Sequence, residues 1–416
     1  MTQHERSKVL LPPMAMHAET TPCVVRGEGC YLYTEDGRKI LDMASGIATN
    51  ALGHCHPKVI AAAEKQLHTL IHAGHNILYY EPYTTLMEKL VEKTGNKYKV
   101  YFSNSGAEAN EGAMKLAKYA TQRPVIISMK NAFHGRTMAT ATITTSNAAY
   151  RKNYEPMMPS VYFAEYPYLF RTPYKMEDGK CPKEYFTQFD EIFKKIVDPS
   201  MVAAIMMEPV QGEGGVFPAT DEFIQGIRKF CDEKGILMLL DEVQAGWGRC
   251  GDFMCYMTYG IKPDVVSMAK AMGGGMPIGG IACTDRVATA FGPGTHGSTY
   301  AGHPVSCAAS LAVLRELKAG KWPENAKKVG DYFAAELAKM PHVVTVRHRG
   351  LFVGVVLEDG INAVEVKRHC IKNHFLVTAI GANIIRMVPP LTIREVDCDE
   401  AVARLSKSIN EVAEGK

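Results

Sequence analysis

The chain has 416 residues, of which 46% are hydrophobic and 22% are charged, and its formal net charge is +3. These values are typical of a globular protein of two domains, and so small a net charge gives no indication of binding to nucleic acid or to a membrane surface. No apolar run approaches the roughly 20 residues of a membrane-spanning helix, and the N-terminal stretch lacks the apolar segment of an export signal. We therefore expect a cytoplasmic protein.

The 11 cysteines are an odd number spread through a long chain, so we expect most of them to be reduced and buried. Two groups invite a metal interpretation, residues 54–56 (HCH) and the pair Cys250 and Cys255. Neither has the paired spacing of a structural zinc site, and we predict no metal. The first group is better interpreted as a turn before a helix that begins at Pro57, because the following residues have helical periodicity.

The N-terminal part contains a polar arm and a hairpin. Residues 1–22 form the arm, and residues 23–42 contain two strand-like runs divided by the turn Glu35-Asp36-Gly37. Further along, residues 99–118 (KVYFSNSGAEANEGAMKLAK) read as a short strand, a turn with Gly106, and a helix in which Glu111 and Lys115 are spaced to pair. The free N–H groups at such a helix start favour an anion, although Ser105 as a simple N-cap is an alternative.

Residues 131–137 (NAFHGRT) follow another strand-like run. Here Phe133 and His134 suit contact with a flat cofactor, and Arg136 offers a fork for a carboxylate. Ordinary packing and a surface charge are the alternative. Residues 162–198 are rich in Tyr, Pro and Lys, and we predict an irregular excursion that serves as a lid or a subunit contact.

Three apolar runs end on an ionisable residue: Glu208, Asp241 and Lys270. Parallel strands would bring these residues to one edge of a sheet, where α/β proteins bind ligands. A lone lysine after a strand is usually an ordinary surface residue, but this combination leads to a specific hypothesis. Lys270 is a Schiff-base lysine, and Asp241 is the partner of a pyridine nitrogen. Five glycines and a proline follow Lys270 within ten residues.

Together with FHGR and EPVQGEGG, these motifs resemble the class III (ω-amino acid) aminotransferases, and most of all the 4-aminobutyrate and ornithine aminotransferases. The resemblance runs from DGRKILDMASGIA near the N-terminus to IIRMVPPL near the C-terminus. It implies an α/β protein of fold type I of the pyridoxal 5'-phosphate (PLP) enzymes, with a mostly parallel seven-stranded sheet between helices in a large domain. It also implies a smaller α+β domain from both termini. We place the large domain at residues 51–303 and the smaller one at 1–50 and 304–416.

The resemblance implies PLP as the cofactor, with Lys270 and Asp241 as catalytic residues. The other implied cofactor-binding residues are Ser105, Gly106 and Ala107 on the phosphate, Phe133 stacked on the ring with His134 beside it, Gln244 near the ring oxygen, and Val243, Ser298 and Thr299. Thr299 would reach the phosphate of the neighbouring subunit, which implies a homodimer with shared active sites, or a dimer of dimers.

For the substrates, the resemblance implies that Arg136 holds a distal carboxylate and that Arg386 takes the α-carboxylate of the 2-oxo acid. Glu208 would pair with Arg386 when that carboxylate is absent, although a purely structural ion pair is the alternative. Ile47 would narrow the pocket near the amine. The main expectation is a ping-pong transfer of the amino group of an ω-amino acid, 4-aminobutyrate, to 2-oxoglutarate.

Several alternatives stay open at this point. They are a β-amino acid or β-aminoacyl-CoA aminotransferase, an ornithine or acetylornithine aminotransferase, and an amino-acid epimerase on the same scaffold. A mutase or decarboxylase of the same fold type, and a non-catalytic relative, are more distant ones. The sequence departs from the family pattern at Ala301 and His303 (AGHP for GGNP) and at Trp247. We expect these positions to reshape the pocket entrance.

Overall fold

The structure is a computed structural model that describes residues 2–15, 21–95, 98–168, 174 and 181–415. Part of the predicted excursion lies outside the described residues. Two described elements overlap its predicted limits, a strand at Val161–Ala164 and a helix at Glu184–Lys195. The strand forms because its apolar residues pair with a buried neighbour, Val125–Met129, so the predicted excursion is too long at both ends.

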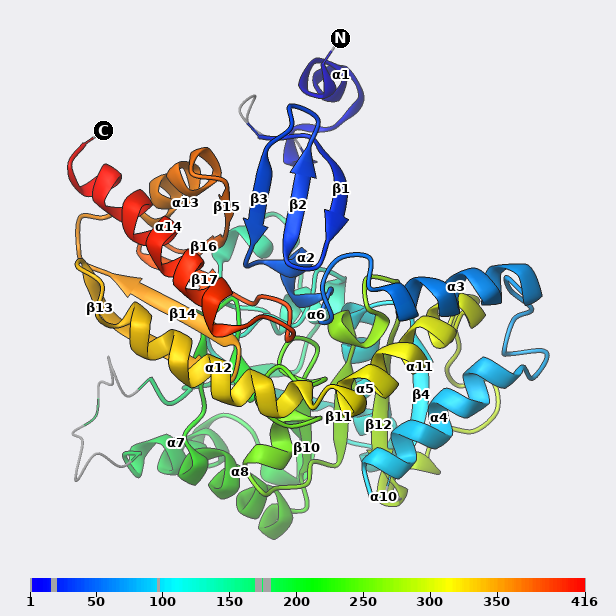
Figure 1. The fold of residues 1–416 in the computed structure, drawn as a ribbon. Coiled ribbons are helices and arrows are strands. Elements are labelled where there is room, and N and C mark those ends of the chain that lie inside the picture. Colours follow the sequence, from blue (N-terminus) through cyan, green and yellow to red (C-terminus); the bar gives the residue numbers. More distant parts are fainter. Residues whose placement is uncertain (1, 16–20, 96–97, 169–173, 175–180, 416) are drawn as a thin grey trace.

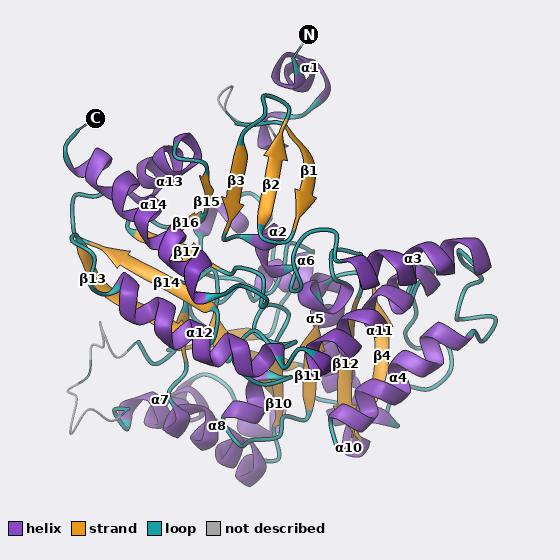
Figure 2. Ribbon diagram, viewed as in Figure 1, coloured by secondary structure: helices purple, strands orange, loops and turns teal. Residues whose placement is uncertain are grey.

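A seven-stranded sheet lies at the centre of the larger part of the molecule, between helices (Figures 1 and 2). Its strands, in spatial order, are β4 (Tyr98–Ser103), β12 (Gly279–Thr284), β11 (Val265–Met268), β10 (Leu237–Asp241), β7 (Val202–Met207), β5 (Val125–Met129) and β6 (Val161–Ala164). Strand β12 runs in the opposite direction to the other six strands of this sheet. The mostly parallel seven-stranded sheet predicted from the resemblance is confirmed.

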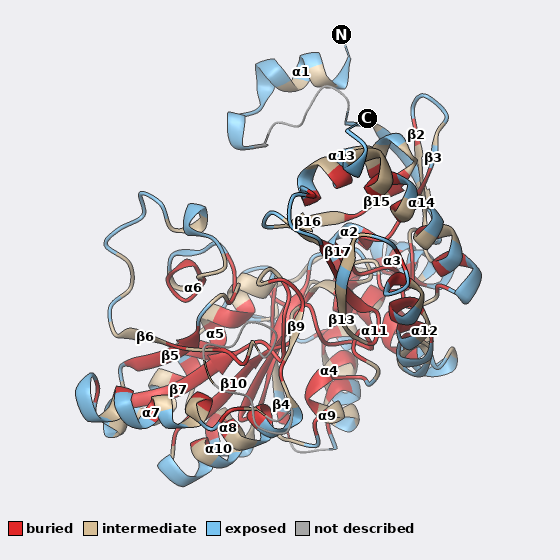
Figure 3. Cartoon of the chain, turned by 90° about the vertical axis from the view of Figure 1, so that its left-hand side faces the viewer, coloured by how far each residue is buried: buried red, intermediate tan, exposed pale blue. Residues whose placement is uncertain are grey.

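The central strands β7, β10 and β11 are buried along their whole length (Figure 3). Successive side chains of a strand point to opposite faces, so each strand supplies two cores. In β10, Leu237 and Leu239 pack in the core under α5 (Gly106–Thr121), whereas Met238 and Leu240 pack in the core on the other face. These alternating layers hold the strand ends in fixed positions.

The carboxyl ends of three adjacent strands meet at one edge. Glu208 follows β7, Asp241 ends β10, and Lys270 comes two residues after β11. The sequence-based prediction that these three residues share one sheet edge is confirmed. Strand β4 ends beside β12, and the turn after it leads into α5.

The smaller part contains strands from both ends of the chain. One sheet has the order β1 (Val24–Glu28), β2 (Tyr31–Thr34), β3 (Lys39–Asp42) and β15 (Phe375–Leu376), and another has the order β13 (Val343–Arg349), β14 (Phe352–Leu357), β17 (Ile384–Met387) and β16 (Thr378–Ile380). Residues 23–42 form three strands rather than the two predicted, because Gly29 adds a second turn. The parallel pairing of β15 with β3 joins the two ends of the chain, whereas the domain limits at residues 50 and 303 stay a prediction.

The remaining helices surround these sheets (Figure 1). They are α1 (Gln3–Leu10), α2 (Ser45–Ala48), α3 (Pro57–Thr69), α4 (Glu81–Lys93), α6 (Met138–Thr142), α7 (Glu184–Lys195), α8 (Asp221–Lys234), α9 (Cys255–Thr258), α10 (Asp285–Ala288), α11 (Pro304–Ala319), α12 (Trp322–Leu337), α13 (Ala363–Lys372) and α14 (Glu395–Ala413). Helix α3 begins at Pro57 as predicted. A two-stranded ribbon of β8 (Val210–Gln211) and β9 (Phe217–Pro218) follows Glu208. Among the described residues, no helix combines the length and apolarity that crossing a bilayer requires.

Candidate active site

A cavity of about 370 Å³ opens at the carboxyl edge of the large sheet. Ten of the predicted site residues line it: Ser105, Gly106, Ala107, Phe133, His134, Glu208, Asp241, Val243, Gln244 and Lys270. The other five predicted residues are not part of its lining: Ile47, Arg136, Ser298, Thr299 and Arg386. The sequence therefore predicts the centre of the site better than its periphery.

Lys270 lies on the cavity wall at the start of a 3₁₀ turn, Lys270–Gly273. Its φ of 46° is in the left-handed region, which residues with a side chain rarely adopt and which is often found at functional sites. Burial, and after it the positive charge of Arg386, lower the pKa of the Lys270 amine to about 8, against the opposite effect of Asp241. The uncharged fraction of this amine near neutral pH is therefore far larger than that of an ordinary lysine.

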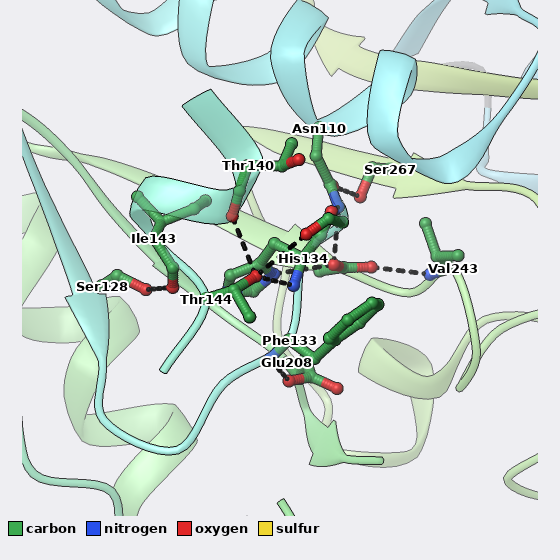
Figure 4. Close-up of polar contacts among 12 residues, drawn as sticks. Asn110, Ser128, Phe133, His134, Thr140, Ile143, Thr144, Glu208, Val243 and Ser267 are labelled. Atoms are coloured by element: carbon green, nitrogen blue, oxygen red, sulfur yellow. Dashed lines mark hydrogen bonds and ion pairs between the residues drawn. The ribbon is translucent and has the colours of Figure 1, made fainter. Parts of the chain in front are cut away.

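Asp241 is buried and accepts hydrogen bonds through both carboxylate oxygens. Three residues that contact it, Asn110, His134 and Val243, are labelled in Figure 4. The carboxylate Oδ2 accepts from Asn110 Nδ2 and faces His134 Nδ1, each at 2.7 Å, and the carboxylate Oδ1 accepts from the Val243 N–H at 2.9 Å. Asn110 is in turn fixed because its Oδ1 accepts from Ser267 Oγ at 2.6 Å. These contacts hold a charged carboxylate in one orientation at the cavity wall.

Asn110 is a site residue that the sequence analysis missed. It lies four residues after Gly106 on α5, so both face the same side of the helix. The signal was present in the sequence: the buried face of this helix otherwise consists of small and apolar residues such as Ala109, Ala113 and Ala117. A fully buried asparagine among them needs polar partners.

The start of α5 is suited to an anion. Ser105 caps the helix by accepting from the Glu108 N–H at 3.2 Å, whereas the N–H groups of Gly106 and Ala107 have no partner within the described part of the chain. A side chain at position 106 would lie 2.6 Å from Val243, so only glycine fits there. The N-cap and the anion site, treated as alternatives above, are compatible. The predicted pair of Glu111 with Lys115 is wrong, because Glu111 accepts from Thr137 Oγ1 while Lys115 contacts His296.

The predicted ion pair between Glu208 and Arg386 is also wrong. Arg386 Nη1 instead donates to Glu213 Oε1 at 2.7 Å. Glu208 is buried and accepts from the N–H groups of Phe133 and Gly212, each at 2.9 Å. Burial raises the pKa of Glu208 to about 7. Glu208 therefore holds the backbone beside Phe133, and Glu213, on the turn between β8 and β9, is the partner of Arg386.

The peripheral residues differ in exposure and come from several elements. Arg136 is exposed, and its guanidinium carbon is 3.7 Å from the centre of the Tyr150 ring. Ile47 is 48% exposed. Ser298 Oγ accepts from Asn104 Nδ2 at 2.9 Å, next to the start of α5, whereas Thr299 is exposed.

The three departures from the family pattern differ in position. Trp247 and Ala301 are buried and outside the cavity lining, so the prediction that they shape its entrance is wrong for both. Trp247 packs on Phe253 instead. His303 lines an adjoining cavity that shares Asn104, Met276 and Pro277 with the first, and its effect on the entrance stays a prediction.

These residues fit PLP. The cofactor needs an amine for its aldehyde, a carboxylate for its ring nitrogen and an anion site for its phosphate, and the cavity wall carries Lys270, Asp241 and the start of α5. Two buried nitrogens on the wall, His134 Nε2 and Gln244 Nε2, have no partner among the described residues and would gain one from a polar ring. In the part of the chain that the structure describes, no three or more His, Cys, Asp or Glu side chains are grouped so that they could hold a metal ion. The fold and the site define a PLP-dependent enzyme of fold type I.

The chain belongs to the class III aminotransferases, whose family model matches residues 14–409. It is 41% identical to an acetylornithine aminotransferase of Gloeobacter violaceus over 403 residues, which are 94% of each chain. Among solved structures it resembles an amine transaminase of an uncultivated Pseudomonas species (28% identity, TM-score 0.89, covering 97% of this chain and 98% of that one). An ornithine aminotransferase of Toxoplasma gondii ME49 is also similar (26% identity, TM-score 0.88, covering 100% and 97%).

Proposed function

We propose that this aminotransferase transfers the terminal amino group of N-acetylornithine to 2-oxoglutarate. Several acetylornithine aminotransferases match this chain at 35–41% identity over nearly its whole length. These relatives favour N-acetylornithine, one of the alternative donors above, over the donor expected first, 4-aminobutyrate. Both donors carry a carboxylate far from the reacting amine. The observation that carries the proposal is that each of two arginines lies next to a cavity residue, Arg136 beside Phe133 and Arg386 paired with Glu213.

PLP, when bound, accepts the amino group and stabilises the negative charge left on the substrate carbon after proton loss. In the proposed mechanism, Lys270 takes that proton from the substrate carbon, a task for which an amine with a pKa near 8 is suited. Asp241 would hold its carboxylate beside the ring nitrogen, and Phe133 and Val243 would hold the ring. Gly106 and Ala107 would bind the phosphate through their N–H groups.

The two arginines are proposed to separate the two substrates. Arg136 has its guanidinium exposed and binds the carboxylate of the donor. Arg386 is neutralised by Glu213 while the donor is bound, and it exchanges this partner for the α-carboxylate of 2-oxoglutarate in the second half-reaction. The same buried arginine thus accommodates both substrates: 2-oxoglutarate, which has a carboxylate beside the reacting carbon, and the donor, which has none there.

A panel of amino donors with 2-oxoglutarate tests the substrate. N-acetylornithine, ornithine, 4-aminobutyrate, lysine, β-alanine and β-aminobutyryl-CoA are compared by the rate of glutamate formation. We expect kcat/KM to be highest for N-acetylornithine, by about tenfold or more over 4-aminobutyrate, since additional pocket contacts of one substrate are worth about that much. A higher value for any other donor would contradict the proposal.

Two variants provide the internal control for this panel. Arg136→Ala should raise KM for the donor, with a loss of about 2 kcal/mol in transition-state binding, and should also raise KM for 2-oxoglutarate, which carries a distal carboxylate of its own. Arg386→Ala should raise KM for 2-oxoglutarate and leave KM for the donor nearly unchanged. An unchanged KM for the donor in Arg136→Ala, or equal effects of Arg386→Ala on both substrates, would remove the two arginines from the proposed roles.

We further propose that the enzyme is a homodimer in which Thr299 completes the partner's site. The support is an exposed apolar patch formed by Ile77 (82% exposed), Tyr79 (90%) and Tyr300 (60%). Its two segments are tied together, because Asn76 Nδ2 donates to the Ser298 carbonyl at 3.1 Å. A patch of this kind on a single chain indicates a protein interface.

Mixing two defective variants tests the shared site. Lys270→Ala lacks the catalytic amine, and we expect Thr299→Ala to be slow at limiting PLP because a phosphate contact is lost. A hybrid dimer of the two has one site with both residues intact, so co-refolded or co-expressed mixtures should recover activity well above the sum of the separate variants. If mixtures show only that sum while hybrids are present by native mass spectrometry, Thr299 acts within its own chain or not at all.

A further inference from the structure

Tyr150 lies beside the proposed carboxylate-binding groups, although the sequence analysis did not select it. It ends a short 3₁₀ turn, Ala148–Tyr150, that follows helix α6. Its ring meets the edge of Phe133 with 5.5 Å between ring centres and an interplanar angle of 78°. Because Phe133 lines the cavity, Tyr150 stands directly behind the wall on which the cofactor ring would rest.

The guanidinium of Arg136 is stacked on this ring. The guanidinium carbon is 3.7 Å from the Tyr150 ring centre, against 5.8 Å from that of Phe133, so Tyr150 is the main aromatic contact. Within the residues described, Arg136 has neither a hydrogen bond nor an ion pair to another side chain. The stacking therefore orients the guanidinium while all its N–H groups stay available to a ligand.

Tyr150 also lies near the second arginine, Arg386, and its partner Glu213. Burial raises the pKa of Tyr150, and the negative charge of Glu213 raises it further, whereas Arg136 and Arg386 act in the opposite direction. Glu213 pairs with Arg386 and lines the same cavity as Phe133, whose ring Tyr150 contacts. Tyr150 therefore touches one carboxylate-binding arginine with its ring and lies close to the counter-ion of the other.

We propose that Tyr150 is a specificity-determining residue of this aminotransferase, which positions both carboxylate-binding arginines. Its ring holds Arg136 in place for the distal carboxylate of the amino donor. Its hydroxyl stabilises the Glu213 carboxylate when Arg386 leaves it for the α-carboxylate of the 2-oxo acid. This inference rests on the proposed function, because it assigns the two arginines to donor and acceptor. A purely structural role, in which Tyr150 only supports Phe133, makes different predictions.

Two variants separate the ring from the hydroxyl, and an adjacent tyrosine provides the control. Tyr150→Leu removes the ring, Tyr150→Phe keeps the ring and removes the hydroxyl, and Tyr154→Leu changes an exposed tyrosine four residues away. Two donors that differ only in the distal carboxylate, 4-aminobutyrate and n-butylamine, are compared in the first half-reaction. Binding of glutarate, a dicarboxylate without an amine, is measured by calorimetry as a second readout.

For Tyr150→Leu we expect the preference for 4-aminobutyrate over n-butylamine to fall about tenfold, within the range of a cation–π contact, and glutarate to bind about tenfold more weakly. For Tyr150→Phe we expect the donor preference and the glutarate affinity to stay within about twofold of those of the unchanged enzyme, while KM for 2-oxoglutarate changes several-fold. Tyr154→Leu should match the unchanged enzyme throughout. Thermal unfolding and cofactor content show whether each variant is folded.

A uniform fall in the rates of both donors for Tyr150→Leu, with unchanged glutarate affinity, would show that Tyr150 only supports Phe133 and would overturn the inference. Effects of Tyr154→Leu as large as those of Tyr150→Leu would also overturn the inference. These outcomes differ from a failure of the proposed function, in which the unchanged enzyme itself would prefer a donor without a distal carboxylate in the panel above.

Discussion

Replacement of Lys270 by alanine is expected to abolish transamination, with a loss of roughly 10⁴-fold or more in kcat, because general acid–base catalysis alone contributes up to about that factor. Lys270 is the lysine that lines the cavity, and burial lowers the pKa of its amine to about 8. The variant loses both the proton carrier and the group that attaches the cofactor covalently. Glutamate formation from the best donor of the panel measures the loss.

The cofactor should still bind to the Lys270→Ala variant, since its phosphate and ring contacts are made by other residues. Borohydride reduction followed by mass spectrometry should attach the cofactor to the unchanged chain at Lys270 and leave the variant unmodified. Lys99→Ala is the matched control, because Lys99 is 62% exposed and its partner Asp285 lies on the surface. Appreciable turnover in the Lys270 variant, or a reduced adduct elsewhere in the unchanged chain, would exclude Lys270 as the catalytic lysine.

The centre of this site could be predicted from the sequence because it depends on strand ends. Glu208, Asp241 and Lys270 each follow an apolar run, and parallel pairing brings the ends of adjacent runs to one edge whatever the details of packing. Glycine at position 106 is similarly informative, since no larger side chain fits against Val243. Backbone geometry of this kind can be predicted from the sequence because it restricts which residue types fit at a position.

The partner of Arg386 could not be predicted in the same way. Glu208 and Glu213 lie five residues apart, on either side of the short strand β8, and either is chemically able to pair with an arginine. The choice is made by backbone N–H groups, because those of Phe133 and Gly212 hold Glu208 inside and leave Glu213 facing Arg386. Such hydrogen bonds depend on the tertiary structure and leave no pattern in residue spacing.

The expected pair of Glu111 with Lys115 illustrates the same limit on a helix surface. Spacing of four residues makes such a pair possible, but its free energy in an isolated helix is only about 0.2–0.5 kcal/mol. Contacts from outside the helix, with Thr137 for Glu111 and His296 for Lys115, are enough to replace it. Local spacing predicts a contact only where no neighbouring segment competes for the same side chains.

Replacement of Asp241 by asparagine is expected to produce the second large effect. The side chain keeps its size and one acceptor oxygen, so Asn110 or His134 can still donate to it, but the negative charge beside the ring nitrogen is lost. Removing one partner of a buried charge pair costs about 3–5 kcal/mol, which corresponds to a fall of roughly 10²–10⁴-fold in kcat. Glutamate formation at saturating PLP measures it, and Asp252→Asn, at an exposed position, is the control.

Stability distinguishes this loss from damage to the fold. In the absence of PLP, the asparagine removes a buried charge but turns its N–H₂ group toward a donor that now serves Asp241, so the apoenzyme should lose at most about 1–3 kcal/mol of stability and stay folded during the assay. Asn110→Ala removes one of the donors to Asp241 and keeps the charge, so its loss of activity should be smaller. A fall of less than tenfold in kcat for Asp241→Asn, or a loss that parallels unfolding, would show that this carboxylate serves the structure of the strand end rather than the reaction.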